Sequence, residues 1–167
     1  VGTYGNRRSP IPVAASSGIP RCIHDLVITL RFNNLEVLEA TLRRAWFDVA
    51  AIIIEPVMGN CAAIEPLPGW LEFVRSRCNE YGIVLIFDEV KTGFRLARGG
   101  AQEVYGVIPD LTTYAKSMGN GYPIAAFGGR REVMDIVGKG VAHGGTHTGN
   151  VVGVAAADAT LGLLQGK

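Results

Sequence analysis

The sequence has nearly equal numbers of positively and negatively charged residues and lacks a long apolar run. Its 167 residues include 16 Lys and Arg against 15 Asp and Glu, for a formal net charge of +1. This balance gives no electrostatic reason to expect nucleic acid or an anionic membrane as a partner. The apolar run at 49–54 is far shorter than the roughly 20 residues that span a bilayer. We therefore expect a globular protein without a membrane span.

Cysteine and histidine are too few and too widely spaced to indicate a disulfide framework or a metal centre. Cys22, Cys61 and Cys78 are widely spaced and form no CxxC pair, which excludes a disulfide scaffold. We expect reduced, mostly buried thiols in a cytoplasmic protein. His143 and His147 are four residues apart, but the glycines around them disfavour a helix that would align both as ligands. The sequence therefore predicts no metal site.

The start of the chain, VGTYGNRRSP, lacks both an initiator Met and the apolar core of a signal peptide. We interpret the chain as cut from a longer protein. Residues 1–22 are rich in Gly, Pro and Ser, so we predict a loop there or the remnant of an interrupted element. The remaining length is sufficient for one domain with a core of its own.

Apolar periodicity predicts alternating strands and helices along the rest of the chain. A strand at 27–32 precedes a helix that Asn33 would cap, with Glu36 completing a capping box. The other predicted strands are 49–55, 83–87, 111–115 and 124–127, and the other predicted helices are 69–81, 101–105, 131–137 and 151–165. This order predicts an α/β fold with a largely parallel sheet and flanking helices, in which the strand at 49–55 is buried on both faces.

Three predicted strands end in polar residues: Glu55, Asp88 and Lys116. In open α/β sheets, ligands bind beyond the carboxyl ends of the strands. Asp88 follows the apolar run IVLIF, so we expect it to be mostly buried, where an unpaired carboxylate is costly. Its cationic partner would be an Arg or Lys from elsewhere in the protein, or part of a bound cofactor.

Lys116, in LTTYAKSMGNGYPIAAFGG, has no carboxylate within five residues on either side. A partly buried amine at a strand end can act as a nucleophile and form a Schiff base. The alternative is an exposed lysine in a loop. An imine-forming lysine and a strand-end aspartate are together what a pyridoxal phosphate site needs. The aspartate keeps the ring nitrogen protonated, and the lysine holds the aldehyde and moves protons.

Four ordered segments carry a resemblance to a known family. They are AAIIIEPVMGN (50–60), LIFDEVKTGFR (85–95), PDLTTYAKSMGNGYPIAAFGGR (109–130) and GGTHTGN (144–150). The chain resembles the class III aminotransferases, which are fold type I pyridoxal phosphate enzymes. Within that class it is most similar to the branch that contains glutamate-1-semialdehyde aminomutase. The resemblance implies that Lys116 is the Schiff-base lysine, that Asp88 pairs with the ring nitrogen, and that Val90 packs against one face of the ring.

The same resemblance implies three further site residues. Thr146 would reach the cofactor phosphate of a neighbouring subunit, which implies a homodimer with shared active sites. Glu55 would lie near the cofactor, where we expect a structural rather than a chemical role. Asn60 stands where many class III transaminases have a glutamate, as in the aminomutase-like branch, and its amide would be able to contact the ring oxygen.

Other features depart from the family pattern. Lys91 follows the DEV triplet, where Gln or Met is common, and it either attracts a substrate carboxylate or points to solvent. The phosphate-binding turn and the stacking aromatic residue of the family are not found in residues 1–22. We therefore interpret residues 1–167 as part of the cofactor-binding large domain, without the N- and C-terminal parts that form the small domain.

The function that the sequence predicts is pyridoxal phosphate-dependent transfer of an amino group from a small-molecule donor to a carbonyl acceptor. The same residues would serve an intramolecular transfer, as in an aminomutase, as well as racemisation or decarboxylation. A catalytically silent domain and a cofactor-independent Schiff-base enzyme are the remaining alternatives. The latter leaves Asp88 and the GGTHTGN segment without a role.

Overall fold

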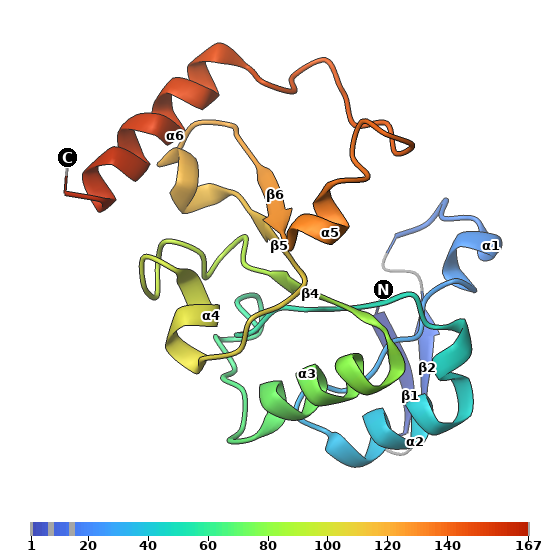
Figure 1. Cartoon of the computed structure of the whole chain (residues 1–167). Coiled ribbons are helices and arrows are strands. Elements are labelled where there is room, and N and C mark those ends of the chain that lie inside the picture. Colours follow the sequence, from blue (N-terminus) through green and yellow to red (C-terminus); the bar gives the residue numbers. More distant parts are fainter. Residues whose placement is uncertain (1, 7–8, 14–15, 167) are drawn as a thin grey trace. The chain divides into compact units, whose positions relative to one another are not determined.

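The computed structural model describes residues 2–6, 9–13 and 16–166, and the chain divides into two compact units at residues 44 and 45 (Figure 1). The first unit contains an antiparallel pair of strands, β1 (Gly2–Asn6) and β2 (Ser9–Val13). A short helix α1 (Arg21–His24) and nearly all of α2 (Leu35–Ala45) follow. The prediction of a loop over residues 1–22 is therefore wrong for β1, β2 and the start of α1.

The predicted strand at 27–32 is also wrong, because these residues form no regular element. Helix α2 is confirmed, and its residues Leu38 and Leu42 are buried. Its cap lies one residue later than predicted: the Asn34 side-chain oxygen accepts a hydrogen bond from the Val37 N–H at 2.9 Å. Asn33 instead has a φ of 60°, a left-handed conformation that asparagine tolerates. The prediction of Asn33 and Glu36 as a capping box is therefore wrong by one position.

A four-stranded sheet organises the second unit, in the order β3 (Ala51–Ile54), β4 (Val84–Asp88), β5 (Leu111–Tyr114) and β6 (Ala126–Gly129). The β3–β4 and β4–β5 pairs are parallel, and β6 runs antiparallel to β5. The prediction of an α/β fold with a largely parallel sheet is confirmed. Burial of β3 on both faces is not found in the described part of the chain, where β3 is an edge strand and Ile53 is 65% exposed.

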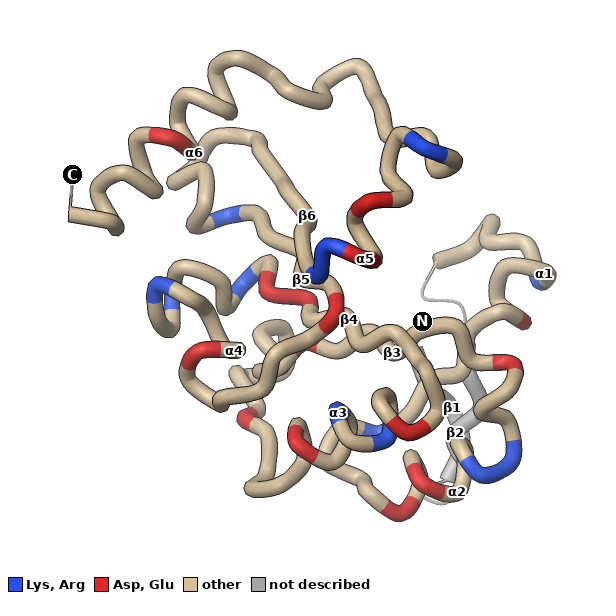
Figure 2. Tube along the Cα trace, in the orientation of Figure 1, with Lys and Arg blue, Asp and Glu red and all other residues tan. Residues whose placement is uncertain are grey.

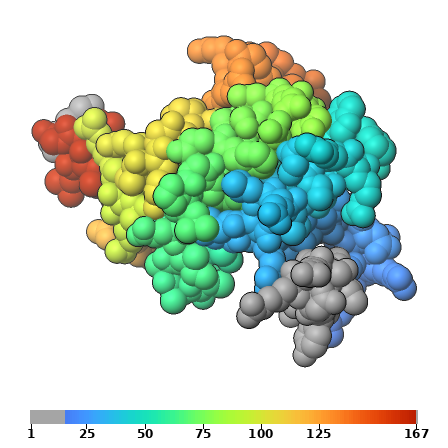
Figure 3. Space-filling model, turned by 90° about the horizontal axis from the view of Figure 1, so that it is seen from below, coloured from blue at the N-terminus to red at the C-terminus, as the bar shows by residue number. Residues whose placement is uncertain are grey.

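Helix α3 (Trp70–Tyr81) connects β3 to β4 and packs against β4, as Figure 1 shows. It buries Leu71, Val74 and Cys78 on one side, and it ends at Gly82, whose φ is 69°. Trp46, in the short 3-10 helix η1 (Trp46–Asp48), stacks on the ring of Tyr81. Figure 3 shows α3 (green) and the segment around α4 (yellow) at the surface when the molecule is viewed from below.

The remaining helices are α4 (Gly100–Tyr105), the 3-10 helix η2 (Lys116–Gly119), α5 (Arg131–Met134) and α6 (Val151–Leu164). The Asn150 side chain caps α6 by accepting the Gly153 N–H at 2.9 Å. Helix α6 lies against η2, and a Cβ at Gly153 would be 3.1 Å from the carbonyl oxygen of Pro123. Asp158 is the one charged residue of α6, which is otherwise tan in Figure 2.

The three cysteines are free thiols. Burial raises the pKa of the Cys78 thiol to about 11, but Cys22 and Cys61 are exposed. The expectation of mostly buried thiols is therefore wrong for two of the three. Among the described residues, no helix combines the length and the apolar character that a membrane crossing requires.

A buried carboxylate at the amino end of β5 joins several elements. Asp110 accepts hydrogen bonds from the Leu85 N–H at 2.7 Å, from Arg75 at 2.8 Å and from Arg130 at 3.0 Å. Burial alone raises the pKa of this carboxyl, but these hydrogen bonds outweigh it, so the net pKa lies below the ordinary 3.8. The residues of this cluster are far apart along the chain, so no local sequence pattern predicts it.

We predict that Asp110→Asn lowers the free energy of unfolding at neutral pH by about 3 kcal/mol, since Arg75 loses its charged partner and Arg130 is left with Glu132, at 3.8 Å. Because folding lowers the pKa of Asp110, its contribution is fully present above the ordinary value of 3.8 and is lost as the pH falls through the folded value. Urea unfolding of both proteins should therefore show a difference that is largest near pH 7 and shrinks below about pH 4. A difference that does not change with pH would contradict this.

Candidate active site

The polar residues at the ends of the strands lie beyond neighbouring strands of the sheet. Asp88 pairs in register with Thr113 of β5, and Lys116 follows two residues after the end of β5. Glu55 directly follows β3, which pairs with β4 on the other side. Since the three strands are parallel, their carboxyl ends meet at one edge of the sheet. The predicted arrangement of Glu55, Asp88 and Lys116 at this edge is confirmed.

Asp88 is half-buried and is held by neutral donors. One of its oxygens accepts the Val90 N–H at 3.0 Å and the Thr113 hydroxyl at 3.3 Å. No ion pair joins Asp88 to a Lys or Arg within the described ranges. The cationic partner that the sequence led us to expect is therefore not one of the described side chains.

The fully buried carboxylate at this edge belongs to the next residue, Glu89, whose exposed fraction is 0%. It accepts hydrogen bonds from the Thr92 hydroxyl (3.0 Å), the Ala101 N–H (2.6 Å), and both the N–H and the side-chain amide of Gln102 (3.1 Å each). The Gln102 amide also lies 3.0 Å from the hydroxyl of Tyr114. These neutral donors satisfy both oxygens and fix the segment from β4 to α4.

No role was predicted for Glu89, although the alternation of buried residues along β4 indicates that position 89 is buried. Leu85 and Phe87 are fully buried, whereas Val84, Ile86 and Asp88, which alternate with them, are half-buried. A strand places alternate residues on one face, so position 89 continues the buried face and position 88 does not. Asp88 is half-buried, so the prediction that it is mostly buried is wrong in extent. The fully buried carboxylate at the end of β4 is Glu89.

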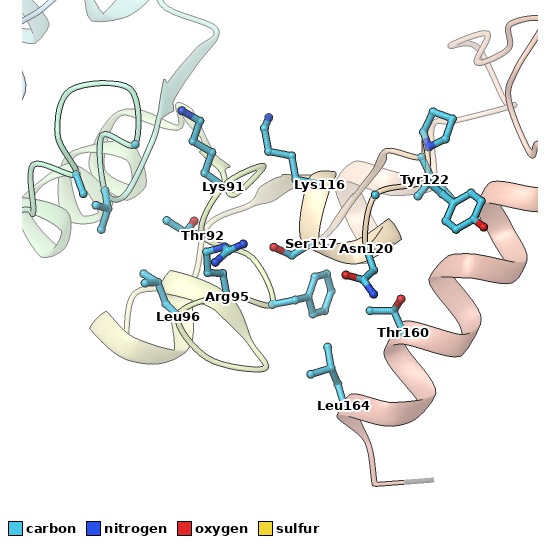
Figure 4. A pocket seen from close by; sticks show the side chains of 17 residues that line it. Lys91, Thr92, Arg95, Leu96, Lys116, Ser117, Asn120, Tyr122, Thr160 and Leu164 are labelled. Carbon is cyan, nitrogen blue, oxygen red and sulfur yellow. The ribbon is translucent and has the colours of Figure 1, made fainter.

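A cavity of about 1100 Å³ opens beside this edge. It is lined by the segment after β3, the loop between β4 and α4, the η2 turn and the end of α6 (Figure 4). Its basic lining residues are Lys91, Arg95 and Lys116, and no Asp or Glu is among its described lining residues. Of the predicted site residues, Lys116 lines the cavity, whereas Asp88, Val90, Asn60, Glu55 and Thr146 do not.

Lys116 is exposed, so the partial burial expected for its amine is not found in this chain. Its φ of 46° lies in the left-handed region, which costs a non-glycine residue about 1 kcal/mol. The preceding Ala115 is extended, and Lys116 begins the η2 turn. In Figure 4 its side chain extends in the same direction as that of Lys91. A strained backbone at a cavity-lining amine is typical of a functional position.

Glu55, Asn60 and Lys91 are linked through the turn after β3. The Glu55 carboxylate accepts the Gly59 N–H at 3.0 Å, and the Asn60 side-chain oxygen accepts a hydrogen bond from the Lys91 ammonium. Glu55 thus holds the backbone of this turn.

Thr146 lies in an exposed turn closed by the hydrogen bond from the Thr148 N–H to the Gly145 carbonyl, and the structure does not bring it to the cavity. His143 packs edge-on against Phe127. Within the described ranges, no group of three or more potential metal ligands occurs.

Lys116 and Asp88 thus lie at the edge of the sheet where open α/β folds bind their ligands, and Lys116 lines a cavity there. The chain belongs to the class-III aminotransferase family, which it matches over residues 17–167. Membership of this family indicates pyridoxal phosphate as the cofactor. The resemblance found in the sequence is thereby confirmed at the level of the family.

Solved structures of transaminases share the fold. An omega-transaminase from Sphaerobacter thermophilus is 35% identical with a TM-score of 0.86, over 98% of this chain and 38% of its own. A transaminase with PLP bound is 30% identical with a TM-score of 0.85, over 93% and 38% of the two chains. A beta-phenylalanine aminotransferase from Variovorax paradoxus is 34% identical with a TM-score of 0.73, over 81% and 31%. This chain thus spans less than two fifths of the length of these structures.

The Glu89 cluster leads to a prediction about glycines at the two ends of α4. Gly100 and Gly106 both have a positive φ, 74° and 67°. A Cβ at Gly100 would be 2.8 Å from the carboxyl carbon of Glu89 and closer still to one of its oxygens, whereas nothing lies within 4 Å at Gly106. We expect Gly106→Ala to cost about 1 kcal/mol of unfolding free energy and Gly100→Ala at least about twice as much. Equal losses in urea unfolding would show that the contact with Glu89 does not matter.

Proposed function

We propose that this chain supplies the lysine and the ring-nitrogen carboxylate of a pyridoxal phosphate-dependent aminotransferase, as part of the large domain of a longer subunit. The observation that carries the proposal is that Asp88 and Lys116 lie at the carboxyl ends of the neighbouring parallel strands β4 and β5. The lysine lines a large cavity without an acidic partner, and the aspartate has no cationic partner in the described part of the chain.

The residues present fit the cofactor. A half-buried carboxylate with only neutral donors suits a protonated ring nitrogen, which would supply the missing positive charge. The Val90 N–H and the Thr113 hydroxyl orient Asp88 from one side. Pyridoxal phosphate, when bound, supplies a ring that accepts electrons from the substrate carbon that loses a proton.

Lys116 has two roles in this proposal. Its amine would hold the cofactor aldehyde as an imine, with release of water, and when free it would move the proton from and to the reacting carbon of the substrate. The short η2 turn holds this residue, and a hydrogen bond from the Met118 N–H to the Ala115 carbonyl closes the turn at 3.1 Å. The backbone is therefore fixed while the long side chain stays free to swing.

The remaining predicted residues take supporting roles. Val90 would pack against the ring and Asn60 would lie near the ring oxygen, whereas Glu55 holds the turn after β3 by accepting the Gly59 N–H. Thr146 contacts the cofactor phosphate of a second subunit, so the active enzyme is a homodimer that takes a small-molecule amino donor and a carbonyl acceptor. Thr146 lies in an exposed turn outside the cavity, and this position supports a role across a subunit interface.

An aminomutase would use the same residues but return nitrogen to a neighbouring carbon of the same molecule. The presence of Asn60 favours this alternative at the sequence level. The two reactions differ in their need for a second substrate. Turnover of an amino donor that requires an added carbonyl acceptor supports transamination, and isomerisation without an acceptor supports the aminomutase.

The central test locates the modified lysine. The full-length subunit and this chain are each incubated with pyridoxal phosphate, reduced with borohydride, digested and examined by mass spectrometry. We expect a pyridoxyl adduct confined to Lys116 in the full-length protein, lost in Lys116→Ala and retained in Lys139→Ala, a change at an exposed lysine outside the cavity. An adduct only in the full-length protein means that this chain lacks part of the site. Labelling spread over surface lysines in both would overturn the proposal.

The role of Asp88 can be tested separately. We expect Asp88→Asn to keep the Lys116 adduct but to lower turnover by more than about a hundredfold, because the charge that keeps the ring nitrogen protonated is lost. Thr113→Val removes only one of the two hydrogen bonds to Asp88 and should cost less than about tenfold. Steady-state kinetics of the two variants decide the point, and similar small losses in both would exclude this role for Asp88.

A further inference from the structure

We propose that Lys91 determines substrate specificity by binding an anionic group of the substrate, so that amino donors with a carboxylate are preferred over matched amines without one. The inference rests on the function proposed above. It concerns a residue that departs from the family pattern and whose role the sequence left open between substrate and solvent.

Contacts with the turn after β3 hold the Lys91 side chain in place. A Cβ added at Gly59 would collide with Cδ of Lys91 and would lie 3.4 Å from its Nζ. The side chain therefore runs directly along the Gly59 backbone, and its ammonium donates a hydrogen bond to the Asn60 side chain. Gly59 is itself fixed by Glu55, which accepts its N–H at 3.0 Å. A lysine that simply points to solvent has no need of such contacts.

The charge of Lys91 is oriented without being neutralised. Asn60 offers a neutral amide oxygen, and Lys91 makes no ion pair in the described part of the chain. An ammonium has three donors, so two remain available after the bond to Asn60. A fixed, unneutralised cation at a cavity edge is suited to bind an anion.

The described lining of the cavity, like Lys91 itself, carries positive charge without a neutralising carboxylate. Lys91, Arg95 and Lys116 line it, and its described lining includes no acidic side chain. Figure 2 shows the basic positions of the loop between β4 and α4 and of the segment after β5 in blue. Figure 4 shows Lys91 and Lys116 extending in the same direction from these two segments. An anion in this cavity would therefore face only basic residues among its described charged lining.

The anion that we expect at Lys91 is the substrate, because other residues, Lys116 and Asp88, bind the cofactor in the proposed site. In the proposed site Lys116 holds the cofactor aldehyde and Asp88 holds the ring nitrogen, and both come from the carboxyl ends of β4 and β5. Lys91 comes three residues after Asp88, and its side chain is held by Gly59 and Asn60 of the turn after β3. A carboxylate carried by the amino donor would form a charge-assisted hydrogen bond there, and an uncharged amine would leave the ammonium without an anion.

The test uses the full-length enzyme loaded with pyridoxal phosphate and pairs of donors that differ only in a carboxylate, such as glutamate with 4-aminobutyrate and β-alanine with ethylamine. Four variants are compared with wild type: Lys91→Met, Lys91→Arg, Gly59→Ala and, as the control, Lys139→Met. Gly59→Ala keeps the charge of Lys91 but displaces its side chain, and the φ of Gly59 is not in the left-handed region. The affinity for pyridoxal phosphate is measured for every protein by absorbance titration.

We expect Lys91→Met to raise KM by about tenfold to a hundredfold for the donor that bears the additional carboxylate, with little change for its partner. Gly59→Ala should shift the same ratio in the same direction by a smaller factor, Lys91→Arg should restore most of the preference, and Lys139→Met should leave it unchanged. High salt should weaken the wild-type preference.

Three results would overturn the proposal: a wild-type enzyme without preference for the additional carboxylate, equal changes of KM for both donors in Lys91→Met, or a loss of pyridoxal phosphate affinity in Lys91→Met that accounts for the change. The last result would assign Lys91 to the cofactor. Failure of the proposed function itself is distinguishable, because it would abolish the borohydride-trapped adduct on Lys116 in the wild-type protein.

Discussion

The parallel register between β4 and β5 is the constraint on which the candidate site depends. It places Asp88 opposite Thr113, whose hydroxyl then reaches the carboxylate, and it brings the start of η2 to the same edge of the sheet. A shift of one residue would move every side chain of β5 to the opposite face. The hydrogen bonds of Asp110 to Leu85, Arg75 and Arg130 at the other end of β5 secure this register.

The two adjacent carboxylates after β4 divide the work between them. Glu89 points into the protein and is saturated by donors from the start of α4, so it stabilises the loop whose residues line the cavity. Asp88 points to the other face and keeps a share of its hydrogen-bonding capacity for a ligand. Alternation along one strand thus buries Glu89 completely and leaves Asp88 half-buried, although both are carboxylates.

The parts of the fold that the sequence predicted well are those set by local pattern. Helix α3 and strand β4 show it: apolar spacing identified the buried side of α3, and Gly82 identified its end. The hairpin of β1 and β2 was missed because strand pairing depends on partners that periodicity does not reveal. The strand predicted at 27–32 failed for the same reason, since an apolar run without a pairing strand stays irregular.

At the candidate site, the sequence predicted the place of three polar residues at the sheet edge but not their contacts. Lys116, Asp88 and Glu55 could be placed because strand ends in a parallel sheet share one edge. The contact of Lys91 with Asn60 and the cluster around Asp110 join residues that are distant in the chain, so only the folded structure brings them together. The left-handed backbone at Lys116 also has no local signature, because lysine rarely adopts it.

The exposed edge of β3 has a consequence for handling the protein in solution. In the described part of the chain this strand pairs only with β4, and Ile53 on it is largely exposed. A short, β-branched strand with free backbone groups on one side is a template for pairing with another molecule. When this chain is produced by itself, we expect its colloidal behaviour to be governed by that edge, with self-association that grows with concentration.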